Sequence, residues 1–195
     1  MSHTRKARLA HVVYRTRRFE AMLAWYQAVF NTHVQSRNPA LAFLTYDDEH
    51  HRFAFADLNV IHPGSGEVDK RGLVGVDHVA YTVESVHALL HDYARLKALG
   101  ILPYWCIHHG LTVSMYYADP DGNQMEFQVD AFDTAEQCNQ YITGPMFDAN
   151  PIGVEFDPQV WLHRLRDGET EANFRARLIH EPVSPIRGAI AHMMD

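Results

Sequence analysis

The chain has 195 residues, 47% of them hydrophobic and 21% charged, which is typical of a globular protein with one sizeable core or two small ones. Its net charge of -7 argues against a surface for nucleic acid or an anionic membrane. No apolar run approaches the ~20 residues that span a bilayer. With only Cys106 and Cys138 and no signal-peptide core, the sequence predicts a reducing cytoplasm. Most of the 14 histidines are expected to be surface or structural residues.

The first part of the chain predicts one strand, one helix and two further strands. An apolar run with His11 at its centre indicates the first strand. Apolar residues at helical spacing from Phe19 to Phe30 indicate the helix, and a polar break follows it. Proline, glycine and clustered charges then indicate a linker. The expected ranges are 7–14, 40–46 and 51–57 for the strands, 19–30 for the helix, 31–39 for the break and 58–73 for the linker.

The pattern then restarts at an offset of 67 residues, since 78 − 11 and 81 − 14 are both 67. His78 and Tyr81 repeat His11 and Tyr14, and the apolar stripe of a helix over 85–99 repeats that of the first helix. We therefore expect an α+β protein with two tandem β-α-β-β-β modules, 5–57 and 74–130, in one catalytic domain over 1–130. Their sheets would form a cupped, barrel-like mixed sheet with the helices outside.

The stretch from Ile107 to Glu126 is predicted to be a hairpin. Its turn, Asp119-Pro120-Asp121-Gly122, combines a fixed φ at proline with the backbone freedom of glycine. Glu126 follows in an apolar strand, where a carboxylate is costly unless it is paired or binds a metal.

Residues 131–195 match neither module and are expected to form a partly helical extension that packs on the domain or on a partner subunit. Asp157-Pro158 predicts a helix N-terminus. The helix should end near Asp167, and a further helix is expected over 169–180. The sequence leaves open whether the extension is a lid, a sheet cover or a dimer contact.

His11, His78 and Glu126 are the candidate metal ligands. The two histidines occupy equivalent positions of the repeat and would face each other across a shared interior. Two imidazoles and one carboxylate with open positions form the facial triad that suits non-haem Fe(II). Taken singly, each histidine is better explained as a satisfied core residue.

These residues resemble a known family, the vicinal oxygen chelate superfamily. The stretch from Ile107 to Glu126 is similar to the signature of the type I extradiol ring-cleavage dioxygenases. The run from His50 to Phe55 resembles a strand of the biphenyl-2,3-diol dioxygenase branch. The resemblance covers about residues 7–130 in a short, two-module form. The matching signature positions are His109, Met115, Tyr116, Asp119, Pro120, Gly122 and Glu126.

The resemblance implies Fe(II), with Mn(II) as a less favoured alternative, held by His11, His78 and Glu126. It implies catalytic roles for His51, His109 and Tyr116, with the choice between His50 and His51 open. The implied reaction inserts both atoms of O2 into a catechol, such as 2,3-dihydroxybiphenyl, in the catabolism of aromatic compounds. The expected partners are a small substrate, O2 and a second copy of the chain, without nucleic acid or membrane.

Three alternatives share the fold. A glyoxalase-like isomerase usually needs four protein ligands, and the first-module position equivalent to Glu126 lies near Ala54, which offers none. A fosfomycin-modifying thiol transferase uses the same triad, and a non-enzymatic drug-binding protein needs no triad at all. Four further residues are candidates to line an apolar pocket for an aryl substituent, with ordinary core positions as the alternative: Tyr104, Trp105, Met146 and Phe147.

Overall fold

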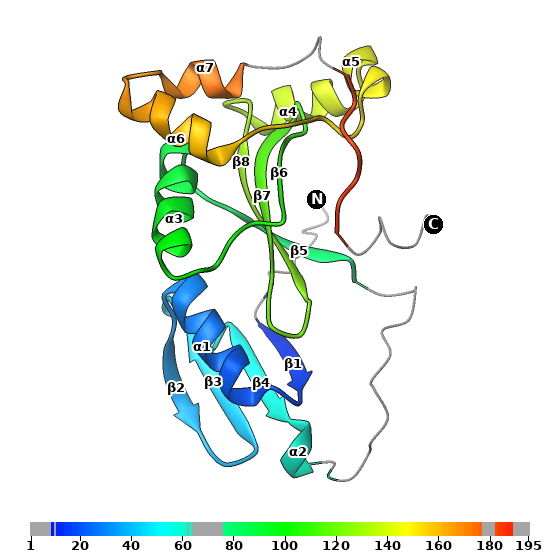
Figure 1. The fold of residues 1–195 in the computed structure, drawn as a ribbon. Coiled ribbons are helices and arrows are strands. Elements are labelled where there is room, and N and C mark those ends of the chain that lie inside the picture. The colour runs from blue at the N-terminus through cyan, green and yellow to red at the C-terminus, as the bar shows by residue number, and fades with distance from the viewer. Residues whose placement is uncertain (1–8, 10, 62, 64–75, 177–181, 189–195) are drawn as a thin grey trace. The chain divides into compact units, whose positions relative to one another are not determined.

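The computed structural model describes residues 9, 11–61, 63, 76–176 and 182–188 (Figure 1). These residues form two compact units, one from the first predicted module and one from the second module with the extension; the 119–121 turn is grouped with the first unit. Across these ranges, no helix is long and apolar enough to cross a membrane.

The first unit is a four-stranded mixed sheet with one long helix. The strand order is β1-β4-β3-β2, with β1 parallel to β4 and the other pairs antiparallel. The helix is held by aromatic packing, since the ring of Tyr26 contacts those of Phe53 and Phe55 at 4.7 and 4.8 Å. The elements are β1 (Val12–Thr16), α1 (Phe19–Phe30), β2 (His33–Arg37), β3 (Leu41–Thr45), β4 (Phe53–Asp57) and α2 (Leu58–Ile61).

Two expectations for this unit need correction. The first strand begins at Val12, so His11 lies directly before it and not at its centre. The polar break over 31–39 contains β2, an edge strand whose five residues are all exposed. Such a strand shows no alternation of apolar and polar residues, so periodicity could not reveal it. Most of the predicted linker, 62 and 64–73, lies outside the described residues.

The second unit repeats this topology and adds a strand, in the order β5-β8-β7-β6-β9. Ser85 caps α3 by accepting a hydrogen bond from the amide of Ala88. The predicted hairpin is β7 and β8, and Gly122 in its turn has the positive φ that favours glycine. The module elements are β5 (His78–Thr82), α3 (Val86–Ala98), β6 (Trp105–His108), β7 (Thr112–Ala118) and β8 (Gln124–Asp130).

The extension is partly helical and completes the second sheet. Asp157 caps α6 as predicted, accepting from the amides of Gln159 and Val160. The helix expected over 169–180 is shorter in the structure and ends at Arg175, while 177–181 lies outside the described residues. The elements are α4 (Ala135–Ile142), α5 (Pro145–Ala149), β9 (Val154–Glu155), α6 (Pro158–Arg166) and α7 (Glu171–Arg175).

The two sheets share one strand-pairing register, with an offset of 67 residues between β1 and β5 (80 − 13) and of 72 between β4 and β8 (126 − 54). Val13 pairs with Ala54 in the first unit, and Ala80 pairs with Glu126 in the second. Ala54 therefore occupies the position that corresponds to Glu126, as expected from the sequence, and supplies no ligand atom. The α+β class and the module order are confirmed, and the strands are hydrogen-bonded as two separate sheets.

Candidate metal and substrate site

One face of the second sheet carries a row of functional side chains. Glu126 on β8 lies opposite Tyr116 on β7, and Tyr116 lies opposite Trp105 on β6. Directly paired residues point to the same face of a sheet. All three are buried, with Glu126 only 5% exposed. The row therefore places a buried carboxylate, a phenol and an indole side by side.

His78 lies next to Glu126 and is held from both sides. Its Nε2 is 3.2 Å from Oε2 of Glu126, and its Nδ1 is 2.7 Å from Oδ2 of Asp77. The hydrogen bond to Glu126 raises the pKa of His78 to about 9, against the opposing effect of burial and with further help from Asp77. Without a metal, His78 is therefore an imidazolium between two carboxylates.

Glu126 stays ionised despite its burial. Burial by itself raises the pKa of this carboxyl. Hydrogen bonds from His78, Ser114 and Tyr116 outweigh that effect, so its pKa is lowered overall. Ser114 also lies 3.0 Å from the hydroxyl of Thr112, which extends the polar chain along β7.

His109 and Tyr116 form a second hydrogen-bonded pair on this face. Nδ1 of His109 contacts the carbonyl oxygen of Ile152, so this nitrogen is the donor. Burial lowers the pKa of His109, against the effects of that carbonyl and of Glu126, so its Nε2 is free to accept. The hydroxyl of Tyr116 lies 3.0 Å from this nitrogen. The pKa of Tyr116 is raised, first by burial and then by the charge of Glu126.

A further series of hydrogen bonds holds Asp77, the residue that orients the ring of His78. Oη of Tyr104 donates to Oε1 of Gln124 over 2.9 Å, and Nε2 of Gln124 donates to the carbonyl oxygen of Asp77 over 2.9 Å. Asp77 in turn accepts from His78. Asp77, which orients the His78 ring, is therefore held by Gln124 at the start of β8 and through it by Tyr104 just before β6.

His11, His50 and His51 cluster in the first unit. One ligand atom from each of them lies within 4.8 Å of the others. The rings of His11 and His51 are 4.2 Å apart, and Nδ1 of His51 is 2.6 Å from Nδ1 of His50. Because two nitrogens can share a hydrogen bond only if one carries a proton, one of these two rings is protonated at Nδ1. The pKa of His51 is lowered, chiefly by burial and then by the charges of His11 and His50.

The structure thus assembles the predicted residues in two groups. His78, His109, Tyr116 and Glu126 lie together on the second sheet, and His11 and His51 lie together in the first unit. Two supporting residues, Asp77 and Ser114, were missed by the sequence analysis. Both had a signal, since Asp77 precedes His78 in the chain and Ser114 shares the strand face of Tyr116.

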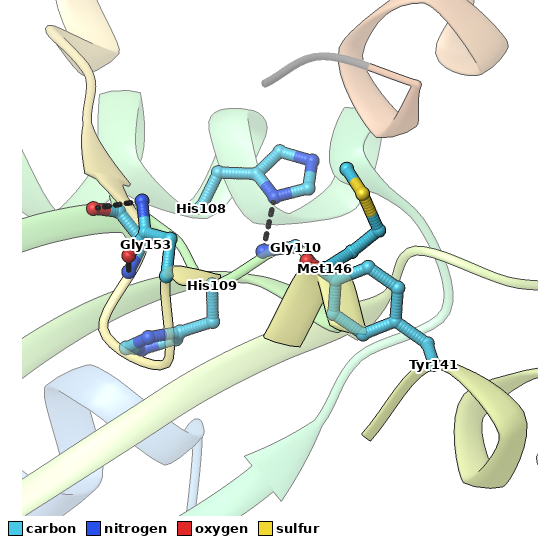
Figure 2. Close-up of a pocket in the computed structure, with 7 residues that line it drawn as sticks. His108, His109, Gly110, Tyr141, Met146 and Gly153 are labelled. Carbon is cyan, nitrogen blue, oxygen red and sulfur yellow. Dashed lines mark hydrogen bonds between the residues drawn. The ribbon is translucent and has the colours of Figure 1, made fainter. Parts of the chain in front are cut away.

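A small pocket lies beside His109 (Figure 2). Figure 2 shows the rings of His108 and His109 pointing to opposite sides of the chain. His108 is satisfied as a buried neutral ring, donating from Nε2 to the carbonyl of Arg175 and accepting at Nδ1 from the amide of Gly110. The lining residues are His108, His109, Gly110, Tyr141, Met146, Asn150 and Gly153.

The four candidate lining residues of the sequence analysis divide between this pocket and the sheet face. Met146 lines the pocket, and Phe147 contacts the ring of Tyr141. Tyr104 and Trp105 instead pack with Tyr116 on the sheet face.

The His78–Glu126 pair fits a divalent metal ion. Neighbouring ligand atoms about 2.1 Å from one ion lie roughly 3 Å apart, which matches the 3.2 Å between Nε2 and Oε2. A ligating histidine usually donates its other nitrogen to a carboxylate, which is the role Asp77 fills here. Imidazole nitrogen and carboxylate oxygen together suit Fe(II).

Comparisons with known proteins identify the family of the chain. A family model described as the Glyoxalase/Bleomycin resistance protein/Dioxygenase superfamily matches residues 8–127. Biphenyl-2,3-diol 1,2-dioxygenase 2 of Rhodococcus globerulus is 44% identical over 85% of this chain and 85% of its own length. Biphenyl-2,3-diol 1,2-dioxygenase 3 of the same organism is 38% identical over 87% of this chain and 88% of its own.

Solved structures show the same fold at low sequence identity. A glyoxalase/bleomycin resistance protein/dioxygenase from Nocardioides has a TM-score of 0.51 and 20% identity, covering 65% of this chain and 85% of that one. A genomically encoded fosfomycin resistance protein from Listeria monocytogenes has a TM-score of 0.50 and 16% identity, covering 70% and 98%. At these identities the likeness concerns the fold alone.

Proposed function

The chain belongs to the Glyoxalase/Bleomycin resistance protein/Dioxygenase superfamily, and on that premise we propose that it is an extradiol ring-cleavage dioxygenase that inserts both atoms of O2 into a catechol. The observation that carries this proposal is the buried row of Glu126 and Tyr116 with His78 beside it, in a chain whose close relatives are named as biphenyl-2,3-diol dioxygenases.

We propose His11, His78 and Glu126 as the ligands of one Fe(II) ion, with Mn(II) less favoured. The geometry of His78 and Glu126 supports this set, and the position of His11 in the repeat supports its inclusion. When bound, the ion supplies Lewis acidity that lowers the pKa of a diol hydroxyl, and it brings the diol and dioxygen together.

Tyr116 and His109 are proposed to orient the diol. The Tyr116 hydroxyl stays protonated at neutral pH because burial and Glu126 raise its pKa, so it acts as a hydrogen-bond donor. His109 is held in one tautomer by Ile152 and presents its Nε2 as an acceptor. Without substrate this donor and this acceptor are bonded to each other beside the carboxylate, so a bound diol would exchange its own hydroxyl groups for that hydrogen bond.

His51 is proposed as the acid/base residue that takes a proton from the diol and returns it. Its lowered pKa supports a neutral ring that can accept at a nitrogen. The short contact between the Nδ1 atoms supplies a route by which His50 receives or restores that proton. His50 is the assisting group in this assignment.

The alternatives of the same fold lack a specific observation in their favour. A four-ligand isomerase needs a donor at Ala54, where there is only a methyl group. The likeness to a fosfomycin resistance protein concerns the fold, whereas the relatives that cover most of the chain are dioxygenases.

The finer assignments follow from the same proposal. We infer a catechol that carries an aryl substituent, such as 2,3-dihydroxybiphenyl, because the relatives are named for biphenyl-2,3-diol. A role in the catabolism of aromatic compounds follows from that substrate. Free thiols at Cys106 and Cys138 support a cytoplasmic location, and a homo-oligomer remains our expectation for its assembly.

Anaerobic reconstitution with Fe(II), followed by oxygen and a panel of catechols, tests the function. We expect stoichiometric oxygen uptake and a yellow ring-fission product. The matched control is Glu126→Gln, which keeps the shape of the side chain and removes its charge. Absence of oxygen uptake with every diol, in protein that retains iron, contradicts the proposal. A purified chain that neither holds nor responds to Fe(II) supports a binding protein instead.

A further inference from the structure

Segment 182–188 crosses the second unit as an extended chain. Its side chains alternate, with Ser184, Ile186 and Gly188 partly buried and the residues between them exposed. Prolines at 182 and 185 favour an extended backbone and cannot donate to a helix. Figure 1 shows this segment, drawn in red, beyond β6 as seen from α3. Its Ile186 packs against Trp105 and Tyr116, which places that side chain on the face that carries Tyr116 and Glu126.

The segment is held by hydrogen bonds and an ion pair on both sides of Ile186. Ser184 donates its amide to the carbonyl of Gly153 over 3.0 Å and accepts from the amide of Glu155 at its Oγ over 2.9 Å. Arg187 forms a two-pronged ion pair with Glu155, at 2.8 and 3.2 Å. These contacts tie the residues on either side of Ile186 to β9, so its side chain has a defined place.

Ile186 packs on the site-facing side chains of the sheet. It contacts an apolar cluster, here named the Trp105 cluster, whose buried members are Trp105, Ile107 and Tyr116 and whose half-buried members are Tyr104, Ile152 and Ile186. Tyr116 belongs both to this cluster and to the proposed diol site. The Trp105 cluster is thus the apolar continuation of the row that begins at Glu126.

The order of strands fixes the direction of that continuation. Trp105 is two strands away from Glu126, and neighbouring strands are about 4.8 Å apart, so the two positions are separated by roughly 10 Å. A ring attached to a catechol extends over a comparable length. The rings of Trp105 and Tyr116 have centroids 5.0 Å apart and are only 8% and 5% exposed, because Ile186 packs against them. A substituent that extends along this row from the diol would therefore meet Ile186.

We infer that Ile186, carried by the C-terminal extension, is a specificity-determining residue that contacts the substituent of the catechol remote from its hydroxyl groups. This inference rests on the proposed function. It assigns the extension, whose role the sequence left open, to recognition of the substrate. Ile152 contributes to the same surface from the loop before β9.

The test compares catechol with 2,3-dihydroxybiphenyl in the full-length protein. Ile186→Ala should lower kcat/KM for 2,3-dihydroxybiphenyl by about tenfold and leave that for catechol within about twofold, because only the larger substrate reaches this side chain. Ile186→Val should give a smaller change in the same direction. The matched control is Val183→Ala, which removes an exposed side chain from the same segment.

Anaerobic titration of both diols into the Fe(II) protein supplies a second readout, since binding then proceeds without turnover. The dissociation constant of 2,3-dihydroxybiphenyl should rise about tenfold in Ile186→Ala, again with catechol unchanged. Equal losses for the two diols, or no loss for either, overturn the inference. A wild-type protein that binds the diols but never cleaves them contradicts the proposed function alone. In that case the ratio of the dissociation constants of the two diols, compared between wild type and Ile186→Ala, still tests the role of Ile186.

Discussion

The Tyr116 hydroxyl donates to Nε2 of His109 over 3.0 Å, a direction fixed by the carbonyl of Ile152 at the other ring nitrogen. The same hydroxyl also hydrogen-bonds Glu126. The single hydroxyl proton of Tyr116 therefore has two possible acceptors, and a bound diol would compete with both for it.

Tyr116→Phe should remove that donor while the ring still packs on Trp105. We expect kcat to fall by about a hundredfold with the iron content unchanged, because the aromatic ring fills the same space. Metal analysis and steady-state kinetics on the same preparation measure both quantities. Full turnover in this variant contradicts the proposed role.

His11→Ala, His78→Ala and Glu126→Ala should each lose iron, since a facial triad reduced to two ligands holds the ion weakly. Exposed His87 offers a control as His87→Ala, which should retain a full equivalent of iron. The measurement is metal content after anaerobic loading and gel filtration. Full iron retention in His11→Ala removes His11 from the ligand set.

Asp77→Asn should weaken metal binding without unfolding the protein. The carboxylate that accepts from Nδ1 of His78 becomes a neutral amide, and such losses typically cost about 10- to 100-fold in metal affinity. Competition with a chelator measures the affinity. The control is Asp92→Asn, which changes a partly exposed pair with Arg95 away from the site and should have no effect on metal affinity. Equal affinities of Asp77→Asn and wild type contradict an orienting role.

Gly153→Ala should destabilise the second unit strongly. The residue has φ +108°, and an added Cβ would lie 2.2 Å from the carbonyl oxygen of His108, which is backbone and cannot rotate away. We expect a loss of at least about 3 kcal/mol in the free energy of unfolding. Gly168 also has positive φ but has no atom within 4 Å of the added Cβ, so Gly168→Ala should cost only about 1 kcal/mol. Denaturant titrations measure the difference, and similar losses in the two variants contradict the steric argument.

The buried His108 makes stability depend on pH. Its pKa is lowered to about 4, chiefly by burial, while the unfolded chain keeps the ordinary value near 6.5. Between these values the unfolded state binds a proton that the folded state does not. The stabilisation is therefore complete above about pH 6.5 and is lost as the pH falls toward 4, by about 2 kcal/mol at pH 5.

Urea unfolding of the metal-free protein at pH 7.5 and pH 5 checks this expectation. His108→Gln should be less stable than wild type at pH 7.5, and the difference should shrink by about 2 kcal/mol at pH 5. Exposed His163 serves as the control in His163→Gln. A difference between wild type and His108→Gln that does not change with pH contradicts the assignment.

The repeat is the part of the fold that the sequence revealed most directly. The apolar stripes of α1 and α3 and the equivalent His11 and His78 follow from periodicity and spacing, and the structure places the elements accordingly. The strand β2 was hidden because an exposed edge strand has no buried face to reveal it. Short elements such as β9 leave no periodic signal at all.

The site was predictable only where a residue is unusual in its setting. Glu126 was recognised because a carboxylate in an apolar strand requires a partner. Gln124 and Ile152 were not, because the first acts through its amide and the second through a backbone carbonyl, which every residue carries. Their roles depend on which strands are paired, and this information appears only in the folded chain.

The extension also has a consequence for solubility. All four residues of β6 are buried, including Trp105 and Ile107. Without β9, the unpaired backbone N–H and C=O groups of β6 could form hydrogen bonds with a strand of another protein molecule. The opposite situation holds at β2, whose exposed polar residues discourage such pairing. A protein truncated before β9 should therefore lose more than the hydrogen bonds between β9 and β6. It should expose an apolar edge that recruits other copies into aggregates.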